Sequence, residues 1–399
     1  MQKLNTLLAG ILLSASFAWA EQTIQTELTA PTSESTQQLM AQVEQLIDSY
    51  YVDEVDKRKL LDGAIKGMLS TLDPNSTYLT EQSLEMLRSS NRGHYYGYGI
   101  EVSTSGDQVE IVTPLEGSSA AAAGILPGDI LLRVDELVAD PSDMEPLISY
   151  IKQASTADRS LLLTLQRHSN LQPLQFELAP SPITVSSSRS LVLADQVGYL
   201  RISSFNRRTA IEVRRSAFAL SKLPLKGLVL DLRNNPGGLL DSAVRIADIF
   251  IDDGTIVTTH GRFNAANSDY QATSFHLFAQ LPMVVLINQG SASAAEIVAG
   301  ALQDHGRAQL MGQRSFGKGT VQSLIPLVDD GGAIKLTTAH YATPNGTFID
   351  QKGIEPDFSI TLADEQQEDI VIGLNLENQW TDDPQIFAAY DYIMDNQSR

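Results

Sequence analysis

The chain has 399 residues, no cysteine, and 48 acidic residues against 28 lysines and arginines, which gives a formal net charge of −20. A surface this acidic argues against nucleic acid and anionic membranes as partners, and a chain without thiols can form neither a disulfide nor a thiolate metal or redox site. The length suffices for two or three domains.

Residues 1–20 have the pattern of an export signal. Lys3 precedes an apolar stretch from Leu7 to Phe17, and Ala18-Trp19-Ala20 is a sequence of the kind that signal peptidase accepts. An N-terminal membrane anchor is the alternative, but the stretch is shorter than the roughly 20 residues that span a bilayer. We therefore expect cleavage after residue 20 and an exported protein, located in a bacterial periplasm, with membrane association as the alternative.

Helical spacing marks the next part of the chain. Residues 21–36 are rich in Thr, Ser and Gln without an apolar period, which is typical of a flexible leader. Apolar side chains then recur at helical spacing over 37–47 and over 60–72, where Asp73-Pro74 ends the pattern. These patterns predict an N-terminal helical region over residues 37–92.

Short strands mark the segment 93–172. Gly97-Tyr98-Gly99-Ile100 forms a glycine-flanked turn into an alternating stretch, and Pro127-Gly128-Asp129 precedes a short apolar run. The segment therefore predicts a small β-rich module, with strands at 100–102, 130–132 and 161–165 and a helix at 144–151.

Residues 181–363 alternate between apolar runs and helical stretches. Such alternation indicates an α/β domain whose sheet is buried by helices. The strands are expected at 198–202, 227–232 and 283–287, and the helices at 210–220 and 239–250. Residues 364–399 are strongly acidic with Arg399 as the only base, and we expect a solvated cap there with one helix at 384–393.

A candidate nucleophile follows the run that ends at Ile287. Asn288 to Glu296 reads Asn-Gln-Gly-Ser-Ala-Ser-Ala-Ala-Glu and opens an apolar helix that reaches about Asp304. A tight turn from strand to helix places a small side chain at the helix N-terminus, where free N–H groups favour developing negative charge. Such a serine is also compatible with a plain helix cap.

A candidate base lies in the segment from Ser315 to Gln322. Lys318 stands between Gly317 and Gly319 in an apolar context, so its ammonium can be desolvated and its pKa lowered toward that of a useful base. A neutral lysine can take the proton of a serine hydroxyl. A phosphate-binding loop is the alternative, but the required G-x-x-x-x-G-K-[ST] spacing is absent.

A glycine pair supplies the third segment, which runs from Asp231 to Leu239. Gly237 and Gly238 follow a predicted strand, and glycines let backbone N–H groups approach a reacting carbonyl closely, as an oxyanion hole requires. Alone, the pair is equally compatible with a simple turn.

Together these segments resemble the carboxyl-terminal processing, or tail-specific, proteases of peptidase family S41A. Further stretches carry the resemblance at 51–53, 72–79, 336–339 and 343–346. The resemblance implies an α/β catalytic core of the ClpP/crotonase type, a spiral of β-sheets and helices, with an inserted PDZ domain over 93–172 and an N-terminal helical region. It also implies a serine endopeptidase with a Ser-Lys dyad and no metal or other cofactor.

Carried over by position, the resemblance makes Ser293 the nucleophile, Lys318 the general base and Gln322 the residue that holds the lysine. Ser291 is an alternative nucleophile, but its spacing to Lys318 does not fit the family. The oxyanion hole would be formed by Gly237, Gly238 and Ala294.

The implied PDZ domain would bind the carboxylate of an apolar C-terminal tail at Gly97, Tyr98, Gly99 and Ile100. Protein substrates with such tails are the expected partners, together with a possible delivery adaptor, and we expect a homo-oligomer. Two positions depart from the family pattern. Ala295 replaces a serine that is not the nucleophile, and Lys152-Gln153 replaces Arg-Gly, which puts a switch that uses the arginine in doubt.

Two rival functions stay open. A catalytically inactive PDZ scaffold is one, although such a protein would be expected to lose Ser293, Lys318 or Gln322. A Ser-His-Asp hydrolase is the other. It could draw on the histidines of the core, but no G-x-S-x-G elbow surrounds any serine. These histidines are His260, His305 and His340.

Overall fold

The computed structural model describes residues 33–397 except 106, 116–117, 127, 168–169, 171, 185, 328–330 and 363–379. The predicted export signal, most of the predicted leader and Pro127 lie outside the described residues. The chain divides into two compact units, residues 1–63 and 64–399. Within the described ranges, no helix is long and apolar enough to cross a membrane.

The first unit contains α1 (Ser33–Tyr50) and the start of α2 (Lys57–Ser70), which confirms both predicted N-terminal helices. The apolar face of α1 is exposed, including Leu39, Val43 and Leu46. Residues 37–92 are mainly helical, but they are not one unit, because β1 (Thr77–Leu79) and α3 (Glu81–Asn91) belong to the second unit. There β1 pairs with a strand from the C-terminal part of the chain, and no local pattern in the sequence announces this pairing.

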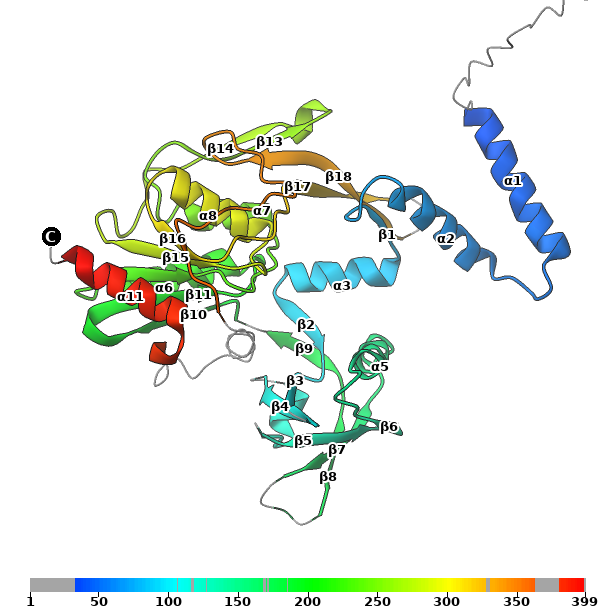
Figure 1. The fold of residues 1–399 in the computed structure, drawn as a ribbon. Helices are drawn as coiled ribbons and strands as arrows, with labels where there is room; N and C mark the ends of the chain where they lie inside the picture. The colour runs from blue at the N-terminus through cyan, green and yellow to red at the C-terminus, as the bar shows by residue number, and fades with distance from the viewer. Residues whose placement is uncertain are drawn as a thin grey trace, which may run out of the picture. The chain divides into compact units, whose positions relative to one another are not determined.

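The centre of the second unit is a six-stranded sheet (Figure 1). Every neighbouring pair is parallel except the first, which is antiparallel. In spatial order the strands are β10 (Ser188–Val192), β11 (Val197–Ile202), β12 (Gly227–Asp231), β15 (Met283–Ile287), β16 (Gln309–Gly312) and β19 (Phe358–Ser359).

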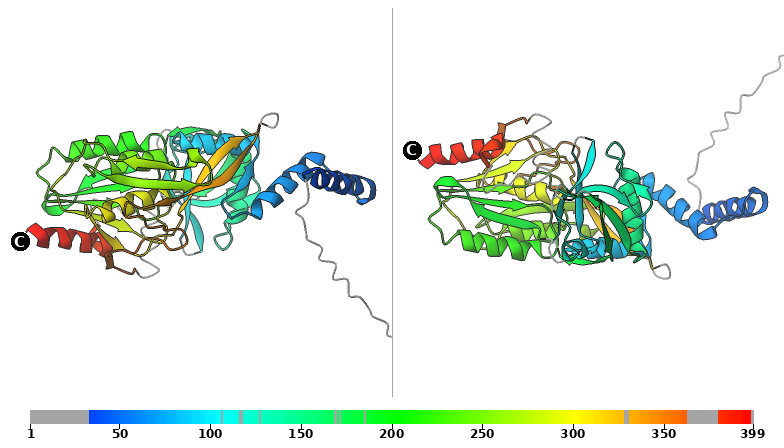
Figure 2. Two further views of the ribbon diagram at one scale, coloured as in Figure 1. Left: turned by 90° about the horizontal axis from the view of Figure 1, so that it is seen from above. Right: turned by 90° about the horizontal axis from the view of Figure 1, so that it is seen from below.

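Helices cover both faces of this sheet, as a parallel sheet requires (Figures 1 and 2). Alternate side chains of one strand point to opposite faces, so Leu228 and Leu230 belong to one core cluster and Val229 to another. The first cluster is completed by α6, α7 and α8, and the second by α11. These helices are α6 (Thr209–Leu220), α7 (Leu240–Ala247), α8 (Ala294–Asp304) and α11 (Pro384–Gln397).

The C-terminal helix corrects one expectation. The predicted solvated cap is wrong for α11, because Ile386, Ala389 and Ile393 are 0% exposed and pack against the central sheet. Their spacing is that of one helical face, while the acidic residues that suggested a solvated segment occupy other positions. Helix α11 is thus part of the α/β core.

A second sheet lies at the edge of this core and is built around the long strand β18 (Ala333–Ala342). Its other strands are β1, β13 (Thr255–Gly261), β14 (Ser268–Gln271) and β17 (Thr320–Pro326). Short 3₁₀ helices occur at Ala194–Gln196, Asn264–Ala266 and Trp380–Asp382.

The small β-rich module has its own sheet and hydrophobic core. It is inserted between β2 (His94–Gly97) and β9 (Ser181–Thr184), which pair with each other. The predicted boundary at residue 172 is wrong, because the last strand of this sheet extends to Leu178. The elements are β3 (Ile100–Ser105), β4 (Gln108–Pro114), α4 (Ser119–Ala122), β5 (Ile130–Val134), β6 (Leu137–Val138), α5 (Glu145–Thr156), β7 (Leu161–Gln166) and β8 (Leu174–Leu178).

Candidate active site

The topology explains why three distant segments meet. Strands β12, β15 and β16 are parallel neighbours, so their carboxyl ends lie at one edge of the sheet. From these ends leave the loops 232–239, 288–293 and 313–319, which contain the glycine pair, the candidate nucleophile and the candidate base. Binding sites of open α/β sheets form at such edges.

Ser293 occupies the turn between β15 and α8 in a strained conformation. Its φ is 55° and its ψ is −113°, outside the regions that L-residues favour. Strain of this kind costs about 1–3 kcal/mol and persists where the surrounding structure imposes it, often at active sites. The turn places Ser293 directly before the N-terminus of α8, where the helix dipole favours negative charge.

A cavity of about 400 Å³ joins the predicted catalytic residues. Its lining includes Ser293, Lys318 and Gln322 together with all three predicted oxyanion residues. Among the described residues, neither a histidine nor a carboxylate lines it, so the described lining offers Ser293 no partners for a Ser-His-Asp triad. Apolar walls are contributed by Leu87, Leu240, Ile297, Val321 and Leu324.

Glu296 ties the nucleophile loop to the base loop, and the sequence analysis did not identify it. Its fully buried carboxylate accepts hydrogen bonds from the N–H groups of Ser293 (2.7 Å), Gly317 (2.7 Å) and Lys318 (2.9 Å), and from the hydroxyl of Ser315 (2.6 Å). The signal that could have found it is a glutamate three positions after a serine that precedes a helix, as in a capping box.

Tyr341, on β18, contacts the same two loops. Its hydroxyl lies within hydrogen-bond distance of the carbonyl oxygens of Ser293 (3.1 Å) and Lys318 (2.5 Å). Burial raises the pKa of Tyr341 well above its ordinary value, so the hydroxyl keeps its proton and donates. Glu296 and Tyr341 therefore fix the backbones of both candidate catalytic residues.

The glycine pair lies against the nucleophile. Gly237 has a φ of +97°, and a Cβ there would come within 2.8 Å of the Cβ of Ser293. Its N–H donates to the side chain of Asn235 (2.9 Å), which occupies one predicted oxyanion donor. The N–H groups of Gly238 and Ala294 donate to no described residue, which leaves them available to an oxyanion.

Lys318 is partly buried in the cavity, and its pKa is lowered. The main cause is desolvation, the nearby ammonium of Lys335 lowers the pKa further, and Glu296 opposes the shift. Within the described chain, its amine makes no hydrogen bond to Ser293 or Gln322. The Gln322 amide donates to the hydroxyls of Thr320 (2.9 Å) and Thr337 (3.4 Å) instead.

The hydroxyl of Ser291, the alternative nucleophile, is buried and already hydrogen-bonded within the protein. It is 0% exposed, donates to the carbonyl of Leu232 (2.9 Å) and accepts from the N–H of Asn288 (3.0 Å). The side chain of Asn288 in turn binds the backbone and side chain of Asn234. These contacts fix the position of the glycine loop (residues 232–239) relative to the nucleophile loop (residues 288–293).

Comparison with known proteins assigns the family. The profile of peptidase family S41 matches residues 196–360, and that of the activating protease CtpB N-terminal domain matches residues 9–83. A carboxy-terminal-processing protease of Bartonella bacilliformis is 38% identical over 367 residues, which cover 90% of this chain and 83% of the relative. The chain belongs to peptidase family S41.

Further relatives agree with this assignment. The carboxy-terminal processing protease CtpB of Bacillus subtilis is 37% identical over 324 residues, covering 80% of this chain and 67% of the relative. The solved photosystem II D1 C-terminal processing protease superposes with a TM-score of 0.50 at 29% identity, covering 83% of this chain and 94% of that one. An S41 protease of Bacteroides fragilis shares the fold, with a TM-score of 0.56 at 14% identity and coverage of 88% and 97%. This S41 peptidase is therefore a serine protease.

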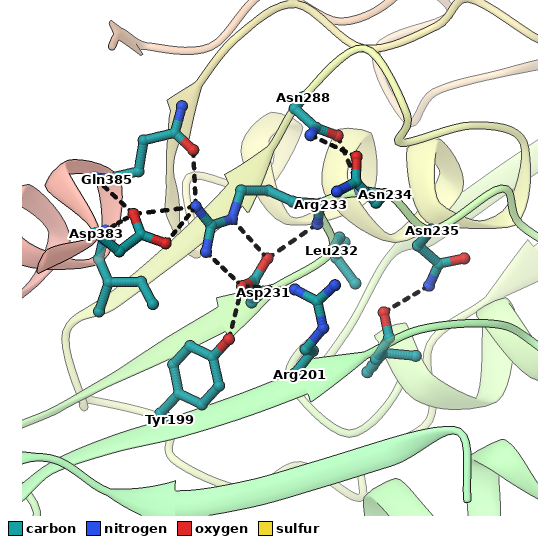
Figure 3. Close-up of polar contacts among 12 residues, drawn as sticks. Tyr199, Arg201, Asp231, Leu232, Arg233, Asn234, Asn235, Asn288, Asp383 and Gln385 are labelled. Atoms are coloured by element: carbon teal, nitrogen blue, oxygen red, sulfur yellow. Dashed lines mark hydrogen bonds and ion pairs between the residues drawn. The ribbon is translucent and has the colours of Figure 1, made fainter. Parts of the chain in front are cut away.

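A buried network of charged residues supports the start of the glycine loop of the S41 peptidase (Figure 3). Arg233 is 1% exposed and binds both carboxylate oxygens of Asp231 (3.0 and 2.7 Å). It also binds Asp383 (2.8 Å) and Gln385 (2.9 Å), which lie at the start of α11. The C-terminal helix thus holds the residue from which the glycine loop departs.

The same network fixes the charge of Asp231. Burial alone would raise the pKa of Asp231, but Arg233 and Arg201 hold it well below its usual range. Tyr199 donates a further hydrogen bond of 2.6 Å to this carboxylate. Removing one partner of such a buried ion pair typically costs about 3–5 kcal/mol, because the remaining charge is left uncompensated.

The state of Lys318 predicts the pH dependence of the S41 peptidase. A lysine acts as a base only when neutral, so kcat should rise with pH through a pKa below the ordinary value of 10.5. Lys335→Gln removes a charge that lowers this pKa and should move the rise to higher pH, whereas Glu296→Gln removes a charge that raises it and should move the rise to lower pH. Single-turnover pH profiles measure both shifts, and shifts in the same direction would contradict the assignment of Lys318 as the base.

Proposed function

We propose that this S41 peptidase is an exported endopeptidase that cuts proteins with a Ser293–Lys318 dyad and recruits them by apolar C-terminal tails. The observation that carries the catalytic part is the shared cavity, in which Ser293 and Lys318 lie with the free N–H groups of Gly238 and Ala294. Peptidase S41 relatives named as carboxy-terminal processing proteases support the same chemistry.

In the proposed reaction, the neutral amine of Lys318 takes the proton of the Ser293 hydroxyl as the oxygen attacks the substrate carbonyl. The negative charge on the carbonyl oxygen is stabilised by the N–H groups of Gly238 and Ala294 and by the dipole of α8. The protonated lysine then gives its proton to the leaving amine, and a water molecule releases the acyl group by the reverse steps. Gln322 lines the same cavity as the lysine and would orient it once the amine rotates toward the serine.

The proposed tail-binding site lies in the small module. Gly97, Tyr98, Gly99 and Ile100 line a cavity of about 690 Å³ with residues of α5. The N–H groups of Tyr98 and Gly99 donate to no described residue and could bind a carboxylate. Among the described strands, β3 pairs only with β4, so its other edge can accept an added strand, as in PDZ domains.

This part of the proposal predicts that the chain end of a protein substrate governs its delivery. A protein with a long, unstructured apolar tail should be cut faster by the wild type when its terminal carboxylate is free than when it is amidated. Deleting the small module should abolish this difference while Ser293 stays competent toward short peptides. Equal rates for the free and amidated proteins in the wild type would exclude carboxylate capture at Gly97–Ile100.

We also propose a location and an assembly state for the protein. The export pattern of residues 1–20 supports a periplasmic protein, and the exposed apolar side chains of α1 support a homo-oligomer. An adaptor that delivers substrates is a further proposed partner. Mass spectrometry of exported proteins retained by the Ser293→Ala variant, but lost with the wild type, would identify the substrates.

A further inference from the structure

A second lysine lines the catalytic cavity. Lys335 lies on β18, opposite Leu324 of β17 and Thr77 of β1. Its side chain is partly buried, and it forms no ion pair or hydrogen bond with any residue that the structure describes. A partly buried ammonium without a partner is costly unless something that binds there compensates it.

The charge of the cavity contrasts with that of the protein. The formal net charge of the chain is −20, yet the described lining contains two lysines and no carboxylate. Clefts lined by one sign of charge concentrate ligands of the opposite sign. Lys318 must be neutral to act as a base, and the Tyr341 hydroxyl is held by backbone carbonyls. Lys335 is therefore the cation that remains for a ligand.

We propose that Lys335 binds a carboxylate of the substrate inside the catalytic cavity. The inference rests on the proposed function of Ser293 and deepens it by naming a substrate feature read at the same site. The carboxylate can come from the chain end or from an acidic side chain, since both present the same two oxygens to an ammonium.

The strand register places this carboxylate near the scissile bond. Gln322 of β17 pairs with Thr337 of β18, and Lys335 lies two residues before Thr337 on the same strand. Two residues of a strand span about 7 Å, which is also the length of two residues of an extended substrate. Lys335 should therefore read a group a few residues from the cut, independently of the small module.

The test uses short peptides with one cleavage site, chosen too short to occupy the small module and the catalytic cavity together. One peptide ends in a free carboxylate a few residues after the cleavage site, the second is amidated there, and the third is amidated with glutamate at the last position. Wild type, Lys335→Gln, Lys335→Arg and Lys222→Gln are compared by kcat/KM. Lys222 lies exposed at the end of α6 and controls for the change in net charge.

We expect the wild type and Lys222→Gln to cleave a carboxylate-bearing peptide at least about tenfold faster than the plain amide, the effect of one charge-assisted hydrogen bond. Lys335→Gln should lose this preference and Lys335→Arg should retain it in part. A preference for the free acid alone identifies the chain end, and an equal preference for the glutamate peptide identifies acidic side chains.

Two results would overturn the inference. One is equal cleavage of all peptides by the wild type, and the other is a preference that survives in Lys335→Gln. Loss of all cleavage in Ser293→Ala shows that the measured activity is the proposed one, so either result then removes the carboxylate site alone. Cleavage that persists in Ser293→Ala would instead overturn the proposed function, and this inference with it.

Discussion

Ser293→Ala and Lys318→Ala should each reduce kcat/KM on an unstructured protein substrate by about 10⁴-fold or more, because neither group can act without the other. For the same reason the double variant should be no worse than either single variant. We expect this because both side chains line the same cavity. Initial rates measured by gel electrophoresis and mass spectrometry, with circular dichroism to verify folding, give the comparison.

Ser291→Ala is the matched control for the nucleophile. It removes a buried hydroxyl two positions from Ser293 and leaves the N–H of Asn288 without its acceptor. The free energy of unfolding should fall by about 1–3 kcal/mol while the folded variant keeps the proposed dyad. If Ser291→Ala were inactive and Ser293→Ala retained more than a few per cent of the rate, the assignment of Ser293 as the nucleophile would be reversed.

Glu296→Gln should lower kcat by about 100-fold with little change in KM, since a small misplacement of reacting groups costs about this much. Each carboxylate oxygen of Glu296 accepts two hydrogen bonds. A glutamine would direct an NH₂ group at two of these four donors and push the Ser293 and Lys318 backbones apart. Stopped-flow kinetics on a short peptide separates kcat from KM.

Glu212→Gln is the control for this change. Glu212 on α6 accepts hydrogen bonds from the N–H and hydroxyl of Ser187 and does not line the catalytic cavity. It should lower stability and leave kcat unchanged. The positioning role of Glu296 would be disproved by a kcat loss no larger than that of Glu212→Gln at equal folded fraction.

The sequence was informative about the site because its chemistry lies in short local patterns. Serine before an apolar helix, lysine between glycines and a glycine pair after a strand are each readable within a few residues. Their convergence also follows from the sequence once β12, β15 and β16 are taken as parallel neighbours, since such strands end at one edge. Strands β11, β12 and β15 and helices α6 and α7 were predicted from periodicity for the same reason.

Long-range contacts could not be predicted in this way. The pairing of Arg233 with Asp383 joins residues 150 positions apart, and no local pattern shows that α11 supports the glycine loop. Likewise, the N–H of Gly237 is occupied by Asn235 through a side-chain rotamer that no pattern specifies. Glu296 could be predicted only in part. Its capping position is visible in the local sequence, whereas its contacts with Gly317 and Lys318 are long-range.

The most direct test of the central claim is the mass of the acyl-enzyme. The peptidase is mixed with an ester substrate that is hydrolysed slowly, the reaction is quenched in acid during turnover, and the intact protein and its peptides are weighed. We expect a mass increase of one acyl group on the peptide that contains Ser293, and none in the Ser293→Ala variant. An adduct on any other residue, or one that persists in Ser293→Ala, would contradict a mechanism in which Ser293 is the nucleophile.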